Sequence, residues 1–213
     1  MCIRDRNSGR AINYVRCAKK CSELVGVNEM TYSGVRRKVF LSHYGGDRAA
    51  VGRFIDKWSS VFIPKQLGVY TNEDFINSDN GDYVMSQIRS KYLGDSTVTI
   101  VLMGTCTHSR RYIDWEIKSS LRQGSYTPNG LIGIVLPHLS NSPNLPERFS
   151  RNYSRDEDSY AQYHWAPTSE NQLGNWIEEA HLSRTTKTNL IKNSQEMWAY
   201  NHVCNACNVN HGT

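Results

Sequence analysis

The sequence predicts an α/β fold in which helices flank a single open, mostly parallel sheet of five strands. From Val35 onward, short apolar runs alternate with stretches whose apolar residues recur every three to four positions, which is typical of parallel βα units. The runs VTIVLM (98–103) and LIGIVLP (131–137) are apolar throughout, as central strands buried on both faces are. A chain of 213 residues, 38% of them hydrophobic, suits one such domain.

The first half of the domain is expected to contain two strands and two helices. Residues 37–43 (RKVFLSH) form the first strand, and Asp47 caps a helix that runs to about residue 61 with apolar side chains at helical spacing. The short run GVYT (68–71) is the second strand. A long polar loop (71–82) separates it from the second helix, which starts where the loop ends.

The second half begins with the third strand at 96–104. The helix after it is expected to span 109–124, with Ser109 as its N-cap and Gly124 at its end. The remaining elements are strands at 131–137 and 160–165 and a closing helix at 170–184.

The domain is expected over residues 36–185. Residues 1–35 lack sustained periodicity and are predicted to be a poorly ordered or non-native leader, and residues 186–213 a C-terminal helix and tail. Residues 1–38 carry nine Lys and Arg against three Asp and Glu, a net charge of +6, whereas the rest of the chain carries −1. Because the excess charge is not spread over the domain, the composition argues against nucleic-acid binding.

The sequence shows no membrane segment. Its apolar runs are far shorter than the roughly 20 residues that cross a bilayer, and the first thirty residues lack the apolar core of a secretory signal. We therefore expect a cytoplasmic protein without a membrane partner.

The six cysteines are expected to be thiols, because a chain of this length does not need a disulfide framework. Cys204 and Cys207 form a CxxC pair with two histidines within four residues of it, and the other close pair, Cys17 and Cys21, is distant in sequence. Zinc sites usually show two ligand pairs at finger-like separation. The prediction is an unstructured tail with reduced thiols and no metal, with zinc as the alternative.

Common catalytic signatures are missing. The chain lacks GxGxxG, GxxxxGK[ST], HExxH and GxSxG, which mark frequent nucleotide-binding and hydrolytic sites. Open α/β sheets bind ligands beyond the carboxyl ends of their strands. The segments expected there, after the first three strands, are LSHYGGDR, TNEDFINSDNGD and GTCTHSRRYIDWE.

Four segments give the chain a family resemblance. These are KVFLSHYGGDR, STVTIVLMG followed by HSRRYIDWEI, GLIGIVLP, and the distal YHW and LGNWIEEAHLSR. Over about residues 36–185 they resemble TIR and TIR-like domains, especially the TIR-like proteins of bacterial Thoeris antiphage defence. The resemblance implies a flavodoxin-like architecture and an enzyme of the NAD nucleosidase or ADP-ribosyl cyclase type.

Glu116 matches the glutamate that active TIR domains require to cleave the nicotinamide glycosidic bond, so the resemblance implies that it is catalytic. In the predicted helix Ile113 and Ile117 lie on the apolar stripe, and Glu116 lies at its margin, neither fully solvated nor buried. A carboxylate near C1′ of the ribose would stabilise an oxocarbenium-like transition state. The alternative is a surface glutamate that interacts favourably with the helix dipole.

Other substrate contacts are assigned around this helix. Arg110 and Arg111 lie in its predicted first turn, where the dipole disfavours a cation but a diphosphate would be held; a solvated pair is the alternative. Tyr44 and Trp115 are candidate stacking surfaces for nicotinamide or adenine, or else packing residues. The expected NAD site comprises Ser42, His43, Tyr44, Asp47, Ser109, Arg110, Tyr112 and Trp115, with no metal and no cofactor besides the substrate.

By the same resemblance, NAD is converted, with release of nicotinamide, into a cyclic ADP-ribose-type signal or a related conjugate. A phage component would trigger the reaction, a separate effector would respond to the product, and the loop at 71–82 would support self-association. One alternative is a non-catalytic TIR-like assembly module. Another is a generic flavodoxin-like nucleotide-binding protein.

Overall fold

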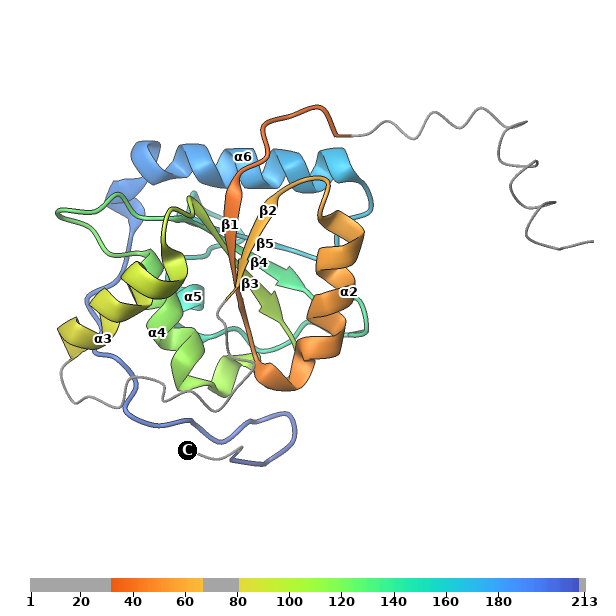
Figure 1. Cartoon of the computed structure of the whole chain (residues 1–213). Helices are drawn as coiled ribbons and strands as arrows, with labels where there is room; N and C mark the ends of the chain where they lie inside the picture. The colour runs from red at the N-terminus through yellow and green to blue at the C-terminus, as the bar shows by residue number, and fades with distance from the viewer. Residues whose placement is uncertain (1–31, 67–80, 211–213) are drawn as a thin grey trace, which may run out of the picture. The chain divides into compact units, whose positions relative to one another are not determined.

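Five parallel strands form one sheet in the order β2-β1-β3-β4-β5 (Figure 1). The computed structural model describes residues 32–66 and 81–210. The strands are β1 (Lys38–His43), β2 (Ile63–Gln66), β3 (Val98–Met103), β4 (Gly130–Val135) and β5 (Ala161–His164). The predicted open α/β sheet is confirmed, and all four of its strand pairs are parallel.

Helices cover both faces of this sheet. On one face lie α2 (Arg48–Trp58) and α6 (Glu170–Thr186), and on the other lie α3 (Gly81–Ile88), α4 (Arg111–Ser120) and α5 (Glu147–Arg151). The shorter helical turns are η1 (Gly45–Asp47), η2 (Arg89–Leu93), η3 (Thr107–Ser109) and η4 (Thr188–Leu190). Among the described residues, none of the helices is long and apolar enough to cross a bilayer.

The alternation of side chains along β1 explains these layers. Val39 and Leu41 belong to the apolar core beneath α2 and α6, whereas Phe40 packs with Ile88 and Trp115 on the α3 and α4 side. Successive side chains of a strand point to opposite faces, so a continuous apolar run fills both cores. Ser42, two residues after Phe40, therefore faces α4.

The second strand differs from the prediction. β2 is Ile63–Gln66, whereas the predicted strand at 68–71 lies outside the described residues, together with the loop up to residue 80. The sequence IPKQ has neither apolar alternation nor a run of β-branched residues, and it contains a proline. Such a strand is tolerated at the edge of a sheet, where β2 lies, because one side of an edge strand needs no ladder hydrogen bonds.

The helix that carries Glu116 begins later than predicted. Its N-cap is Arg110, with φ −97° and ψ 122°, so the expectation of Ser109 as N-cap is wrong. The Ser109 hydroxyl donates a hydrogen bond to the Cys106 carbonyl at 3.0 Å and is thereby used within the preceding 3-10 turn. α4 also ends at Ser120, before the predicted stop at Gly124.

The C-terminal segment 191–210 lies along α4, so the expectation of an unstructured tail is wrong for these residues (Figure 1). The Trp115 indole N–H donates to the Trp198 carbonyl at 2.7 Å, and the backbone N–H of Arg111 donates to Asn201 Oδ1 at 2.9 Å. The His202 N–H donates to the Ser109 carbonyl at 2.9 Å. These bonds satisfy polar groups at the start of α4 that would otherwise face water.

A buried ion pair joins α4, α5 and this C-terminal segment. Arg148 on α5 donates to both carboxylate oxygens of Asp114 on α4, at 2.7 and 3.2 Å, and both side chains are almost fully buried. The Trp198 N–H donates to the same carboxylate at 3.0 Å, and Arg148 also donates to the Glu196 carbonyl at 2.9 Å. The Asp114 charge is thus fully compensated, as burial requires.

Replacing Arg148 with Met should lower the free energy of unfolding by about 3–5 kcal/mol, because Asp114 would remain buried without its cation. Arg151 is the matched control. It lies on the same helix and pairs with Glu147 at the surface, so Arg151→Met should cost less than about 1 kcal/mol. Urea denaturation of the two variants tests the comparison, and equal losses would contradict it.

Candidate functional site

The order of the strands places a topological switch point between β1 and β3, where a ligand crevice is expected. The chain leaves β1 through α2 on one face of the sheet and enters β3 from α3 on the other face. In open α/β sheets, ligands bind at such a switch point, outside the carboxyl ends of the strands. The residues at that edge are the end of β1 with the η1 turn and the connection from β3 to α4.

Glu116 lies on α4 beside Ser42, which is at the end of β1. Its side chain is 5% exposed, and its Oε2 atom makes no hydrogen bond within the described residues. Burial raises the pKa of the carboxyl group to about 8, while the Ser42 hydroxyl at the end of β1 opposes the rise. The Ser42 Oγ atom is itself buried and meets no hydrogen-bond geometry. Glu116 Oε2 and Ser42 Oγ are therefore both buried without a hydrogen-bond partner in the part of the chain that the structure describes.

The expectation that Glu116 lies at a partly solvated margin is wrong. α4 packs against the sheet on one side and is followed along its length by segment 191–210, so even its polar residues Asp114, Ser119 and Ser120 are buried. Asp114 obtains an arginine partner, whereas no ion pair among the described residues includes Glu116. An uncompensated buried carboxyl group costs stability, and such groups concentrate at functional sites.

Arg110 and Tyr44 lie together at the carboxyl ends of β1 and β3. The Arg110 guanidinium carbon lies 4.4 Å from the centre of the Tyr44 ring, within the range of a cation–π contact. The Arg110 side chain is 5% exposed, and its Nε donates to the Cys106 carbonyl at 3.3 Å. Arg110 thus occupies the extended N-cap position, not the helical first turn that was predicted. Only Arg111 lies in that turn.

Asp47 contributes another carboxyl group at the end of β3. A Cβ atom at Gly104 would overlap the Asp47 carboxylate, so this glycine lets the carboxylate rest on the backbone. Burial raises the pKa of Asp47, and the nearby His138 opposes the rise. Its Oδ2 atom makes no hydrogen bond within the described residues.

Several predicted contacts serve other purposes. Trp115 is 8% exposed, packs against Phe40 and Ile88, and is hydrogen-bonded to segment 191–210, so the structure supports the packing interpretation of this residue. Tyr112 packs edge-on against Trp115, with ring centres 5.3 Å apart. Ser109 is fully buried in the η3 turn. These side chains support α4 from the side of the C-terminal segment.

His43 is a half-buried group at the end of β1. Its Nδ1 lies 3.5 Å from the Leu41 carbonyl. Burial lowers its pKa, with a further contribution from the charge of Arg48, so the neutral imidazole is favoured.

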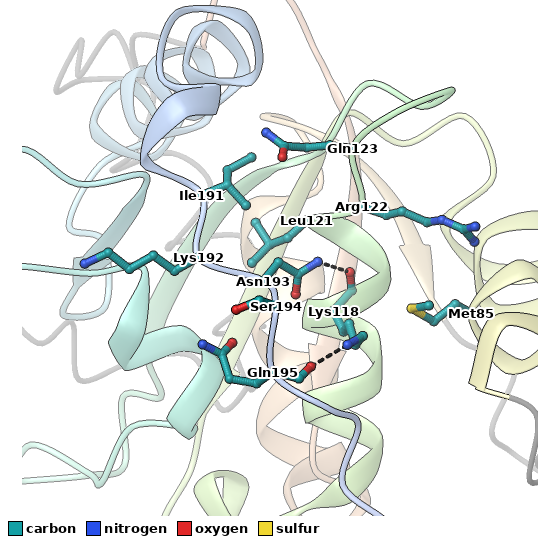
Figure 2. Close-up of a pocket in the computed structure, with 10 residues that line it drawn as sticks. All are labelled: Met85, Lys118, Leu121, Arg122, Gln123, Ile191, Lys192, Asn193, Ser194 and Gln195. Carbon is teal, nitrogen blue, oxygen red and sulfur yellow. Dashed lines mark hydrogen bonds between the residues drawn. The ribbon is translucent and has the colours of Figure 1, made fainter.

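The structure also contains two cavities away from Glu116. One, of about 680 Å³, lies between the end of α4 and segment 191–195, where Lys118 binds the Gln195 carbonyl and Asn193 binds the Lys118 carbonyl (Figure 2). The other, of about 450 Å³, lies beside α2 and is lined in part by His138 and Pro167. Neither includes Glu116, and the segment 67–80 that follows β2 lies outside the described residues.

Sequence reasoning missed Asp114, Arg148 and Cys106 as residues that organise this region. In the sequence, Asp114 is an acidic residue two positions before Glu116, and Cys106 is a single cysteine after the third strand. Neither position indicates a partner. Their partners lie 34 residues away for Asp114 and 98 residues away for the Cys106–Cys204 contact. No local pattern carries that information.

Comparison with known proteins supports the family resemblance. A family model described as "Thoeris protein ThsB, TIR-like domain" matches residues 40–141. The matched segment runs from β1 past β4 and contains Ser42, Tyr44, Asp47, Arg110 and Glu116. No curated protein matches the chain.

The raised pKa of Glu116 predicts a specific pH dependence of stability. Between the ordinary value of 4.5 and about 8, the folded protein keeps a proton that the unfolded chain has lost, so the free energy of unfolding falls as pH rises across this window. Glu116→Gln removes this contribution.

The variant should therefore gain melting temperature relative to wild type as pH increases from 5 to 8.5, measured by calorimetry. Glu179 lies at an exposed position of α6 and serves as the control. The melting temperature of Glu179→Gln should differ from that of wild type by the same amount at every pH. If the melting temperatures of wild type and Glu116→Gln change in parallel with pH, the pKa of Glu116 is not raised.

Proposed function

We propose that this chain, whose residues 40–141 belong to the TIR-like domain family of the Thoeris protein ThsB, cleaves NAD at the nicotinamide glycosidic bond in antiphage defence. The products are nicotinamide and an ADP-ribose unit that is joined to a nucleophile, as a cyclic ADP-ribose-type signal or a related conjugate. NAD is the substrate, and the reaction requires no resident cofactor.

One observation carries the proposal: a buried, uncompensated carboxyl group at the switch point of the sheet. Glu116 has no cation beside it in the described residues, whereas Asp114, two residues earlier on the same helix, is paired twice over with Arg148. A buried carboxyl group without a cation destabilises the folded protein unless a bound ligand supplies an opposite charge. NAD brings the missing partner, because its nicotinamide ring is cationic.

The chemistry follows from this charge. When the C1′–N bond breaks, its electron pair moves to nicotinamide, which leaves as a neutral base, and positive charge develops on the ribose. An ionised Glu116 near C1′ stabilises that charge more in the transition state than in the ground state. The bound pyridinium charge also favours loss of the Glu116 proton. Water or another nucleophile then forms the new bond at C1′ and releases its own proton.

Neighbouring groups have supporting roles in this proposal. The Ser42 hydroxyl lies beside Glu116 and favours the ionised form of the carboxyl group. The Tyr44 ring and the Arg110 guanidinium present an aromatic surface and a positive charge at the same edge, which suits a nucleobase or nicotinamide ring and the adjoining diphosphate. Asp47, which rests on Gly104, and His43 lie at the β1 side of the same edge.

The biological context completes the proposal. A phage component activates the enzyme, the nucleotide product reaches a separate effector, and self-association involves the loop at 71–82, most of which lies outside the described residues. A non-catalytic assembly module is the competing function. It predicts that Glu116 can be replaced without loss of defence.

Glu116→Gln should abolish nicotinamide release, because glutamine keeps the shape of the side chain but cannot carry the negative charge. The measurement is chromatography of NAD incubated with purified protein and lysate of infected cells. Wild type should also show kcat/KM for NAD that rises with pH and levels off above about 8, where free Glu116 loses its proton. Equal NAD consumption by wild type and variant would refute the catalytic assignment and favour the assembly module.

Arg110→Ala should raise KM for NAD by about tenfold or more and change kcat less, because a diphosphate contact is made in both the ground and transition states. Arg111→Ala is the control. The Arg111 guanidinium donates to the Ala199 carbonyl and the Tyr112 hydroxyl, so its loss should lower the melting temperature more than it changes KM. If KM is unchanged in Arg110→Ala, the diphosphate does not bind at this end of α4.

A further inference from the structure

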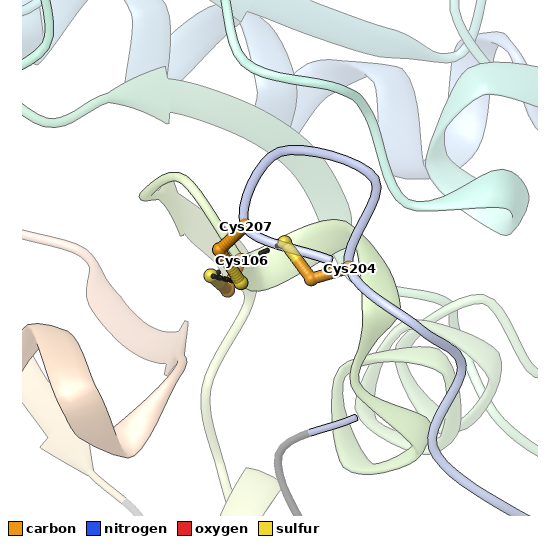
Figure 3. Close-up of side chains that lie close together, drawn as sticks. All are labelled: Cys106, Cys204 and Cys207. Atoms are coloured by element: carbon orange, nitrogen blue, oxygen red, sulfur yellow. Dashed lines mark hydrogen bonds between the residues drawn. The ribbon is translucent and has the colours of Figure 1, made fainter. Parts of the chain in front are cut away.

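Three cysteines from distant parts of the chain lie together at the start of α4. Cys106 follows β3 and directly precedes the η3 turn, and Cys204 and Cys207 come from the C-terminal segment (Figure 3). The Cys106 sulfur lies 3.2 Å from that of Cys204 and 3.6 Å from that of Cys207, and all three sulfurs lie within 4.8 Å of one another. No other cluster of this kind occurs in residues 32–66 and 81–210.

The backbone around the CxxC pair is folded to present both thiols on one side. The N–H groups of Cys207 and Asn208 donate to the Cys204 carbonyl at 3.3 and 2.7 Å, and the Cys204 N–H donates to the Val209 carbonyl at 3.0 Å. Asn208 has φ 54°, the left-handed conformation that asparagine tolerates better than most residues. The result is a tight loop that reverses the chain directly after Cys207 and turns its thiols toward Cys106.

We propose that Cys106, Cys204 and Cys207 bind one zinc ion, and that this ion fastens the C-terminal segment to the start of α4. Zinc binds thiolates at about 2.3 Å in tetrahedral geometry, which separates neighbouring sulfurs by about 3.8 Å. The sulfurs of this cluster already lie near that separation.

The chemistry of the cluster fits a soft cation. Three thiolates at this distance repel one another, and a divalent cation removes that repulsion. Binding displaces the protons still held by the thiols and involves no oxidation.

The sequence predicts no zinc site, because Cys204 and Cys207 have no second pair of ligands near them in the chain. In the structure a third thiol comes from Cys106, 98 residues before Cys204. His202 is not part of the cluster. Its ring stacks on Trp198 with centres 3.7 Å apart, and His211 lies outside the described residues.

The position of the cluster gives the ion a structural task. Residues 193–202 are hydrogen-bonded to Lys118, Trp115 and Arg111 of α4 and to Ser109 of the preceding η3 turn, and the CxxC loop comes directly after them. A metal bridge from Cys204 and Cys207 to Cys106 closes this contact at the end of α4 that adjoins the crevice. The ion is thus a clasp for the segment, and the proposal stands independently of NAD cleavage.

Zinc content of the full-length protein, purified without chelators under reducing conditions, tests the proposal. Elemental analysis should find about one zinc per chain in wild type and in Cys17→Ser, whereas Cys106→Ser and Cys207→Ser should each lose most of it. Cobalt substitution should give thiolate-to-cobalt charge-transfer absorption in wild type, weakened in each ligand variant. Wild-type protein without zinc that also fails to take up cobalt would overturn the proposal.

Measurements on wild type alone cover the case in which a variant fails to fold. Removing the metal with a strong chelator should lower the melting temperature by about 4 °C or more and speed hydrogen exchange in residues 193–204, and added zinc should restore both. Hydrogen exchange in β3 and β4 should change little, because these strands are held by the sheet. A disulfide between two of the three cysteines in metal-free and freshly purified protein alike, seen by mass spectrometry, would contradict the zinc site.

Discussion

The burial of α4 on two sides is the constraint on which the rest of the structure depends. The sheet covers one side of this helix, and the segment 191–210, together with α5, covers much of the remainder. A helix buried in this way cannot leave polar side chains to water, so each needs a partner inside the protein. Asp114 has Arg148 and the Trp198 N–H, while the Trp115 indole has the Trp198 carbonyl. Of the two carboxyl groups on α4, Glu116 is the exception within the described residues.

That exception connects packing with chemistry. On the same helix the Asp114 carboxylate is fully compensated, whereas Glu116, beside Ser42, has one oxygen without a hydrogen bond within the described residues. A protein gains no stability from this arrangement, whereas a cationic substrate at the switch point would complete it. The segment 191–210 holds α4 through Arg111, Trp115 and Lys118, so the proposed function depends on this segment for the position of the helix. The proposed zinc clasp extends this dependence to Cys106, Cys204 and Cys207.

The sequence predicted the sheet well because its strands are continuous apolar runs and its helices are amphipathic, both of which are local signals. Glu116 and the edge residues Ser42, Tyr44 and Asp47 were proposed from the family resemblance, and the match over residues 40–141 supports that family. The predictions failed where contacts between residues distant in sequence, or the position of a strand in the sheet, determine the local structure. The N-cap moved to Arg110 because Ser109 bonds back to Cys106, and β2 escaped notice as a short proline-containing edge strand. The C-terminal segment has little regular structure of its own, so only its contacts with α4 reveal its order.

The protonation state of Glu116 tests the central claim most directly. Infrared or carbon-13 NMR titration of its carboxyl group, assigned by difference from Glu116→Gln, can follow ionisation in the free protein and with a non-cleavable NAD analogue that retains a cationic ring. The account predicts titration near pH 8 in the free protein and at lower pH with the analogue bound. Titration near the ordinary value of 4.5, unchanged by the analogue, would contradict it.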